Sequence, residues 1–210
     1  MCKVKGIIFD FDGVILNSVH VKTDAFAKMY EQYGETIVKR VLIHHLDNGG
    51  MSRYEKIKYY HENFLKEILS VFELEELAKQ FSGLVIDRVV NSPYIPGALQ
   101  FIKKYSKKLP LFISTGTPVI EINEILERKN LARYFTGVYG SPEKKESHIK
   151  RIMASHNLKP SSLVFYGDSK IDLEASANYG TSFTLIKNDD NKKLFRLFKG
   201  KAINNFLEEE

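Results

Sequence analysis

The chain has 210 residues, of which 43% are hydrophobic, and its formal net charge is +5. This length and composition allow a substantial core, in one domain with an insertion or in two small domains, and they exclude disorder as the dominant state. The single cysteine, Cys2, excludes an intramolecular disulfide. With neither a signal peptide nor a long uncharged apolar stretch in the sequence, we expect a cytoplasmic protein with no membrane contact.

The excess of basic residues favours an anionic partner, and nucleic acid is one candidate. Acidic residues are interspersed along the chain, however, and the densest basic stretch, residues 103–108, fits the solvated end of a helix. We therefore expect no nucleic-acid partner. A mildly positive field would also steer a small phosphorylated substrate.

Two aspartates follow the first apolar run of the chain, residues 4–9. Asp10 and Asp12 would lie where a buried strand ends, and parallel sheets bind ligands outside the carboxyl ends of their strands. An ionised pair at such a place is costly unless a cation or a reaction accounts for it. The alternative is a turn in which backbone N–H groups satisfy both carboxylates, since Asp favours turns and Gly13 suits one.

A helical pattern without strand-like runs occupies residues 19–90. Apolar stripes at helical spacing recur within it, and we expect them to form a core rather than bind a cofactor. The three stripes are Ala25, Phe26, Met29, Tyr30 and Tyr33; Ile57, Tyr60, Phe64, Leu65 and Ile68; and Leu74, Leu77, Phe81, Leu84 and Val85.

Polar linkers at residues 17–18 and 91–93 bracket this helical region. A small lid domain hinged on a catalytic domain would be connected in this way. We predict a helical cap domain at residues 17–93, inserted into a catalytic core formed by residues 1–16 and 94–210.

Apolar runs and helical patterns alternate along the rest of the chain. With the first run, the expected strands are residues 4–9, 109–114, 136–139, 163–166 and 182–186, and the expected helices are residues 98–105, 119–129, 145–156 and 169 to about 177. This alternation predicts an α/β protein: a doubly wound, Rossmann-like parallel sheet with helices on both faces.

Polar residues also follow the later strands of this sheet. Thr115 and Gly116 offer a hydroxyl and open N–H groups that would form a phosphate-sized anion site, or else a helix cap. At the next strand end, a lysine at the start of a helix is unfavourable to the helix dipole. Another interaction would then hold this lysine, and the alternative is that Lys144 or Lys145 is merely exposed.

The fourth strand delivers another carboxylate, Asp168, with Asp172 one helical turn later. Each of these two residues would otherwise cap a helix. Four acidic groups and a lysine at one edge of a sheet indicate a partial shell of the hard oxygen ligands that Mg²⁺ prefers. The reaction class predicted by this set is phosphoryl transfer, in which Asp10 attacks phosphorus and Asp12 serves as acid and base.

These motifs, in this order, resemble those of the haloacid dehalogenase superfamily over essentially the whole chain. The helical insertion after the first motif is similar to that of the subgroup that includes phosphoglycolate phosphatases and beta-phosphoglucomutases. The resemblance implies that Asp10 is the nucleophile, Asp12 the acid/base and Thr115 the phosphate-binding hydroxyl. It also implies that Lys145, rather than Lys144, bridges nucleophile and phosphate.

The same resemblance implies that Mg²⁺ is the cofactor. Its ligands would be the Asp10 carboxylate, the Asp12 carbonyl oxygen and Asp168, with Asp172 helping directly or through water. Gly13 and Gly116 would contribute to phosphate binding. Haloacid dehalogenases proper lack the second aspartate of the first motif, so the presence of Asp12 argues against carbon–halogen cleavage.

The cap contains a glycine-rich segment, residues 48–53, that resembles the substrate-specificity loop of related sugar-phosphate enzymes. Arg53 would then contact the distal part of the substrate, because Arg binds phosphate or carboxylate in a bidentate manner. The alternative is an ordinary arginine at a helix start. His44, His45 and His61 show no ligand pattern, and we interpret them as cap surface or as satisfied polar residues.

We therefore predict a Mg²⁺-dependent phosphatase that hydrolyses a small phosphorylated metabolite through an aspartyl phosphate. We expect a monomer, with a weak dimer as the alternative. A sugar phosphomutase is the alternative enzyme. Similar mutases carry a histidine where this chain has Lys22, which disfavours that activity. Asn17 stands where many relatives have an aspartate, and the sequence does not explain this difference. The non-enzyme alternative is a degenerate phosphate-binding module.

Overall fold

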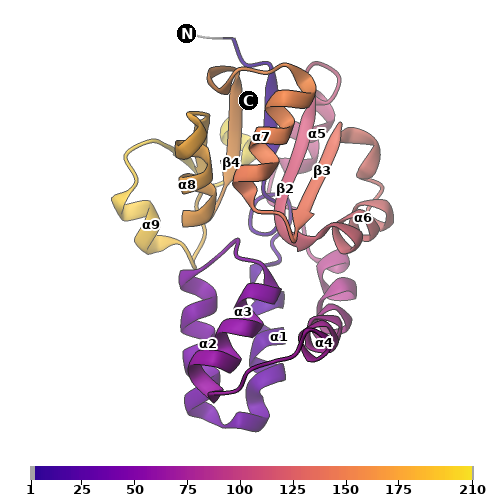
Figure 1. The fold of residues 1–210 in the computed structure, drawn as a ribbon. Helices are drawn as coiled ribbons and strands as arrows, with labels where there is room; N and C mark the ends of the chain where they lie inside the picture. Colours follow the sequence, from indigo (N-terminus) through magenta and orange to yellow (C-terminus); the bar gives the residue numbers. More distant parts are fainter. Residues whose placement is uncertain (1–2, 210) are drawn as a thin grey trace.

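The computed structural model describes residues 3–209, which form a sheet-based core and a helical cap (Figure 1). The cap lies beyond the carboxyl ends of the strands (Figure 1). In this described part of the chain, six parallel strands are arranged in the order β3-β2-β1-β4-β5-β6. The strands are β1 (Gly6–Phe9), β2 (Leu111–Pro118), β3 (Gly137–Ser141), β4 (Leu163–Gly167), β5 (Ser182–Ile186) and β6 (Lys201–Ile203). The predicted fold class, a doubly wound α/β sheet, is confirmed.

Helices cover both faces of this sheet. The core helices are α5 (Ala98–Tyr105), α6 (Val119–Arg128), α7 (Lys145–His156), α8 (Lys170–Tyr179) and α9 (Lys192–Leu197). Successive side chains of β1 point to opposite faces, so Ile8 packs in the cluster that α7 and α8 cover, while Ile7 and Phe9 join the larger cluster with α5 and α6. Because both faces are buried, β1 is a continuous apolar run in the sequence.

Three details of the sheet differ from the prediction. The first strand begins at Gly6, two residues later than expected, and β2 continues past Ser114 to Pro118 through a shift of register. The sixth strand and the helix before it were not predicted. β6 has three residues, of which Ile203 alone is buried, so it leaves no apolar run to detect.

The cap consists of α1 (Val19–Tyr30), α2 (Glu35–Asp47), α3 (Arg53–Tyr60) and α4 (Val71–Asn91), with a short turn of 3-10 helix at Glu31–Tyr33 and of π-helix at His61–Leu65. Its interior is aromatic: the ring of Phe26 lies 4.4 Å from that of Phe81 and 5.6 Å from that of Tyr60. This packing explains the apolar stripes of the sequence.

One prediction for the cap was wrong in part. Ile68 does not continue the stripe of α3, because the helical turns end at Lys66, whose φ is 63°, and Ile68 is 90% exposed. Of the two alternatives for the cap histidines, surface or satisfied polar residues, burial favours the second for His45 and His61. Both form hydrogen bonds, His45 with Lys56 and His61 with Glu67.

The strand order determines where a site can form. β1 is central, and the chain adds β2 and β3 on one side of it before it crosses to add β4 and β5 on the other. Such a switch point opens a crevice at the carboxyl ends of the neighbouring strands. Within residues 3–209, no helix is both long enough and apolar enough to cross a membrane.

Candidate active site

Asp10 lies immediately after β1 and is held from two sides. Its Oδ1 accepts a hydrogen bond from the Phe11 N–H at 2.7 Å, and its Oδ2 is 2.8 Å from Lys145 Nζ. Lys145 is the first residue of α7, and its ammonium also lies 2.5 Å from Asp172 Oδ1. All three charged side chains are at most 5% exposed. The structure thus brings together three residues that the sequence placed at separate strand ends.

Asp172 is positioned by the start of α8. Its Oδ2 accepts hydrogen bonds from the Ser169 N–H and the Ser169 hydroxyl, while the Ser169 Oγ accepts from the Asp172 N–H, which forms a capping box. Both carboxylate oxygens of Asp172 therefore have protein partners. In this arrangement Asp172 orients the Lys145 ammonium toward Asp10, and its predicted contact with a metal stays a prediction.

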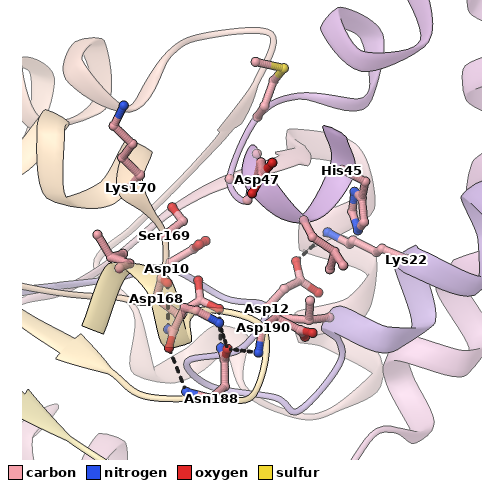
Figure 2. A pocket seen from close by; sticks show the side chains of 18 of the residues that line it. Asp10, Asp12, Lys22, His45, Asp47, Asp168, Ser169, Lys170, Asn188 and Asp190 are labelled. Carbon is pink, nitrogen blue, oxygen red and sulfur yellow. Dashed lines mark hydrogen bonds and ion pairs between the residues drawn. The ribbon is translucent and has the colours of Figure 1, made fainter. Parts of the chain in front are cut away.

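Asp168 follows β4 at the same edge of the sheet (Figure 2). Its Oδ2 accepts a hydrogen bond from Asn188 Nδ2 at 2.8 Å, and its backbone carbonyl accepts from Asn191 Nδ2 at 2.8 Å. Neither asparagine was predicted from the sequence. Both follow β5 in the sequence. Ligands bind at the carboxyl ends of parallel strands, so a search for polar residues after β5 would have found them.

The carboxylates of Asp10, Asp168 and Asp172 fit a divalent cation. Each offers an oxygen, and these atoms all lie within 4.8 Å of one another. Burial raises the pKa of Asp10 to about 7, although Lys145 acts in the opposite direction. The pKa of Asp168 is raised well above its usual value, mainly by burial and next by the charge of Asp10. One lysine does not balance three buried carboxylates, whereas a hard cation with oxygen ligands would.

The carboxylate of Asp12 points away from this cluster, toward the cap (Figure 2). Its Oδ1 accepts from the Ser18 hydroxyl at 2.6 Å, and its Oδ2 accepts from Lys22 Nζ at 2.5 Å. Burial alone would raise the pKa of Asp12, but Lys22 and the hydroxyls of Ser18 and Thr117 lower it below its usual value. A cap residue therefore holds the predicted acid/base in its ionised form.

Two glycines allow the chain to close around the site. Gly13 has a φ of +78°, and a Cβ there would lie 2.1 Å from Asp168 Oδ2. A Cβ on Gly116 would lie 2.5 Å from the carbonyl oxygen of Gly50, in the cap loop. Thr115 is buried beside Gly116, and its Oγ1 accepts a hydrogen bond from the Thr117 N–H at 3.2 Å.

The cap and the core together enclose a cavity of about 500 Å³ over these residues. Asp10, Asp12, Thr115, Gly116 and Asp168 line it from the core, and Lys22, His45, Gly50, Arg53 and Lys56 line it from the cap. The cavity is large enough for a small metabolite that is surrounded on most sides.

Arg53 lines the cavity but already has a partner in the core. Its Nη2 is 2.5 Å from Glu121 Oε1 and its Nη1 is 2.7 Å from Glu121 Oε2, and the two side chains are 4% and 5% exposed. Nη1 also donates to Ser82, and the guanidinium lies 4.6 Å from the centre of the Phe81 ring. Arg53 joins α3 of the cap to α6 of the core, and its predicted contact with substrate stays a prediction.

Glu121→Gln is expected to destabilise the protein by about 3–5 kcal/mol, because it leaves the buried Arg53 charge without a counter-charge. Glu124→Gln is the matched control. Glu124 lies on the same helix in an exposed ion pair with Arg128, where a loss of at most about 1 kcal/mol is expected. Urea denaturation monitored by circular dichroism measures both. Equal losses in the two variants would contradict a structural role for the Arg53–Glu121 pair.

Comparison with known proteins identifies the family. The sequence model of one family, the haloacid dehalogenase-like hydrolases, matches residues 7–186 of this chain. The chain belongs to this family. A phosphorylated carbohydrates phosphatase of Thermotoga maritima is 30% identical over 188 residues, which cover 84% of this chain and 82% of that protein. The resemblance to this superfamily that the motifs indicated is confirmed.

Solved structures share the fold over nearly the whole chain. A haloacid dehalogenase-like hydrolase from Streptococcus pneumoniae has a TM-score of 0.71 at 19% identity and covers 100% of this chain and 98% of its own. A beta-phosphoglucomutase from Clostridium difficile has a TM-score of 0.78 at 17% identity and covers 99% of this chain and 93% of its own. Similarity at this level of identity supports the fold and not a substrate.

Proposed function

We propose that the protein is a Mg²⁺-dependent phosphatase that hydrolyses a small phosphorylated metabolite through an aspartyl phosphate at Asp10. The observation that carries the proposal is the position of the Asp10 carboxylate, which is 2.8 Å from Lys145 and beside Asp168 in a cavity covered by the cap. The relative from Thermotoga maritima, a phosphatase of phosphorylated carbohydrates, supports the same class of reaction.

Two steps account for hydrolysis. In the first, Asp10 Oδ attacks phosphorus and the bond from phosphorus to the ester oxygen breaks. Asp12, which Lys22 keeps ionised until then, takes up a proton when the substrate binds and gives it to the leaving oxygen. In the second, Asp12 removes a proton from water, whose oxygen attacks phosphorus and releases Asp10 and inorganic phosphate. Asp12 thus regains in the second step the proton that it gave in the first.

The remaining polar groups bind the phosphoryl group. Lys145 would neutralise charge on the phosphoryl oxygens, and the Thr115 hydroxyl and the Gly116 N–H would donate hydrogen bonds to them. Asp10, Asp168 and the carbonyl oxygen of Asp12 would hold Mg²⁺, which when bound screens the negative charges of nucleophile and phosphate from each other.

Removal of the metal is expected to stop turnover. Hydrolysis of p-nitrophenyl phosphate should fall by at least about 100-fold in excess EDTA and return when Mg²⁺ exceeds the chelator, because charge neutralisation by a metal contributes several kcal/mol. Full activity in EDTA would exclude the proposed cofactor.

The alternative enzyme is a mutase, and its product separates it from a phosphatase. With glucose 1-phosphate and a sugar bisphosphate primer, a phosphatase releases inorganic phosphate, whereas a mutase forms glucose 6-phosphate. Lys22, the residue that the resemblance aligns with the histidine of similar mutases, forms an ion pair with Asp12. Formation of glucose 6-phosphate as the main product would replace the proposed function.

A further inference from the structure

The basic residues that line the cavity differ in how their charges are balanced. Within residues 3–209, Lys56 has no carboxylate oxygen within 4.0 Å, while each of the other lysines and arginines in the cavity wall has an acidic partner. The paired residues are Lys22 with Asp12, Arg53 with Glu121, Lys170 with Glu174 and Lys193 with Asp47. Lys56 is also only 2% exposed, so water does not compensate its charge.

His45 is the nearest polar neighbour of Lys56. Lys56 Nζ lies 2.8 Å from His45 Nδ1 and 3.2 Å from the His45 carbonyl oxygen. Burial, then the charges of Lys56 and Lys22, lower the pKa of His45 to about 2, so its ring is neutral. An ammonium group donates and cannot accept, so Nδ1 is the acceptor and Nε2 carries the hydrogen.

His45 Nε2 has no hydrogen-bond partner, although it is buried. The cap side of the cavity therefore contains an ammonium without a counter-charge and, on the neighbouring His45, an N–H without an acceptor (Figure 2 shows His45 beside Lys22). Both conditions are costly in a folded protein. Burial, followed by the Lys22 charge, lowers the pKa of Lys56 to about 7, with Asp12 acting in the opposite direction. The charged form of Lys56 is therefore disfavoured near neutral pH, and a bound oxyanion would favour it. An oxyanion near the two groups would remove both costs.

We propose that Lys56, supported by His45, binds a second oxyanion on the organic part of the substrate, so that preferred substrates are phosphomonoesters that also carry a carboxylate or a second phosphate. This inference rests on the proposed function. The groups that react with the transferred phosphoryl come from the core, whereas Lys56 comes from α3 of the cap. Contact with both ends of the substrate would then require the cap to be closed.

Paired substrates test the inference, because they differ in the second anion alone. One pair is 2-phosphoglycolate and 2-hydroxyethyl phosphate, and the other is fructose 1,6-bisphosphate and fructose 6-phosphate. The wild-type protein is expected to have the higher kcat/KM for the doubly anionic member of at least one pair. The pair that responds identifies the second group as carboxylate or phosphate.

Lys56→Met is expected to lower kcat/KM for that doubly anionic substrate by about 10- to 100-fold, mainly through KM, because a hydrogen bond to a charged group contributes about 1.5–3 kcal/mol. Its kcat/KM for the singly anionic member should stay within about twofold, and Lys56→Arg should restore part of the preference. Lys58→Met is the matched control, since Lys58 lies on the same helix and its side chain is 62% exposed. A melting temperature for each variant verifies that it is folded.

Three results would overturn the inference. They are an equal loss for both members of a pair in Lys56→Met, an unchanged preference in Lys56→Met, and no preference in the wild-type protein. Absence of Mg²⁺-dependent hydrolysis of p-nitrophenyl phosphate by the wild-type protein would refute the proposed function as well, which distinguishes the two failures.

Discussion

Asp10→Asn is expected to reduce kcat for p-nitrophenyl phosphate by about 10⁴-fold or more, which is the scale of loss when a covalent nucleophile is removed. The amide is nearly the same size as the carboxylate, and its oxygen can still accept the Phe11 N–H, as Asp10 Oδ1 does at 2.7 Å. The substitution therefore removes the nucleophile and leaves the surrounding structure in place. Steady-state kinetics at saturating Mg²⁺ measures the loss.

Stability and trapping of the intermediate separate a chemical defect from a folding defect. Without metal, Asp10→Asn should be at least as stable as the wild-type protein, because it removes one of three clustered negative charges. Acid quench with ³²P-labelled substrate should trap phosphate on the wild-type chain and not on the variant. Labelling of Asp10→Asn at the wild-type level would show that another residue is the nucleophile.

The core part of the site could be predicted because parallel strands end at one edge of a sheet. Asp10, Lys145 and Asp168 are far apart in the sequence, yet each follows a short apolar run and precedes or begins a helix. Strand direction alone then places them near one another. The same reasoning gave the fold class, which depends on periodicity over long segments and not on single contacts.

The cap contacts could not be predicted, because they depend on how the helices of the cap pack on the core and on one another. Lys22 with Asp12, Arg53 with Glu121 and Lys56 with His45 join residues whose spacing in the sequence carries no pattern. Helical periodicity shows which face of a cap helix is buried, but not which polar residues on that face contact the core or another cap helix.

These contacts change which cap residue we expect to bind the distal part of the substrate. The glycine-rich loop suggested Arg53 as the group that binds the distal part of the substrate. In the structure, however, Nη1 and Nη2 of Arg53 both donate hydrogen bonds to the Glu121 carboxylate. Lys56, which the sequence did not single out, has the unbalanced charge in the cavity wall. Charge balance within the folded structure thus distinguishes a cation that joins two domains from one that is free to bind a ligand.

Lys145→Met is expected to lower both stability and activity. Burial alone would lower the pKa of Lys145, but Asp10 and Asp172 raise it above its usual value, so the ammonium is charged and is the cation these two carboxylates share. Its loss leaves two buried carboxylates close together, at a cost of about 3–5 kcal/mol. Urea denaturation in EDTA should show this loss, and kcat should fall by about 100-fold or more, since a charged group that faces the transferred phosphoryl is missing.

Two further variants test this explanation. Lys144→Met should cost less than about 1 kcal/mol, because the Lys144 side chain is 75% exposed and its ammonium lies 4.0 Å from Glu55. Lys145→Met combined with Asp172→Asn should regain a large part of the lost stability, because it removes one of the unbalanced charges, but it should regain no activity. Equal denaturation midpoints for Lys144→Met and Lys145→Met would refute the view that Lys145 neutralises the acidic cluster. If the double variant recovers activity, the role of Lys145 in stabilising charge during phosphoryl transfer is also wrong.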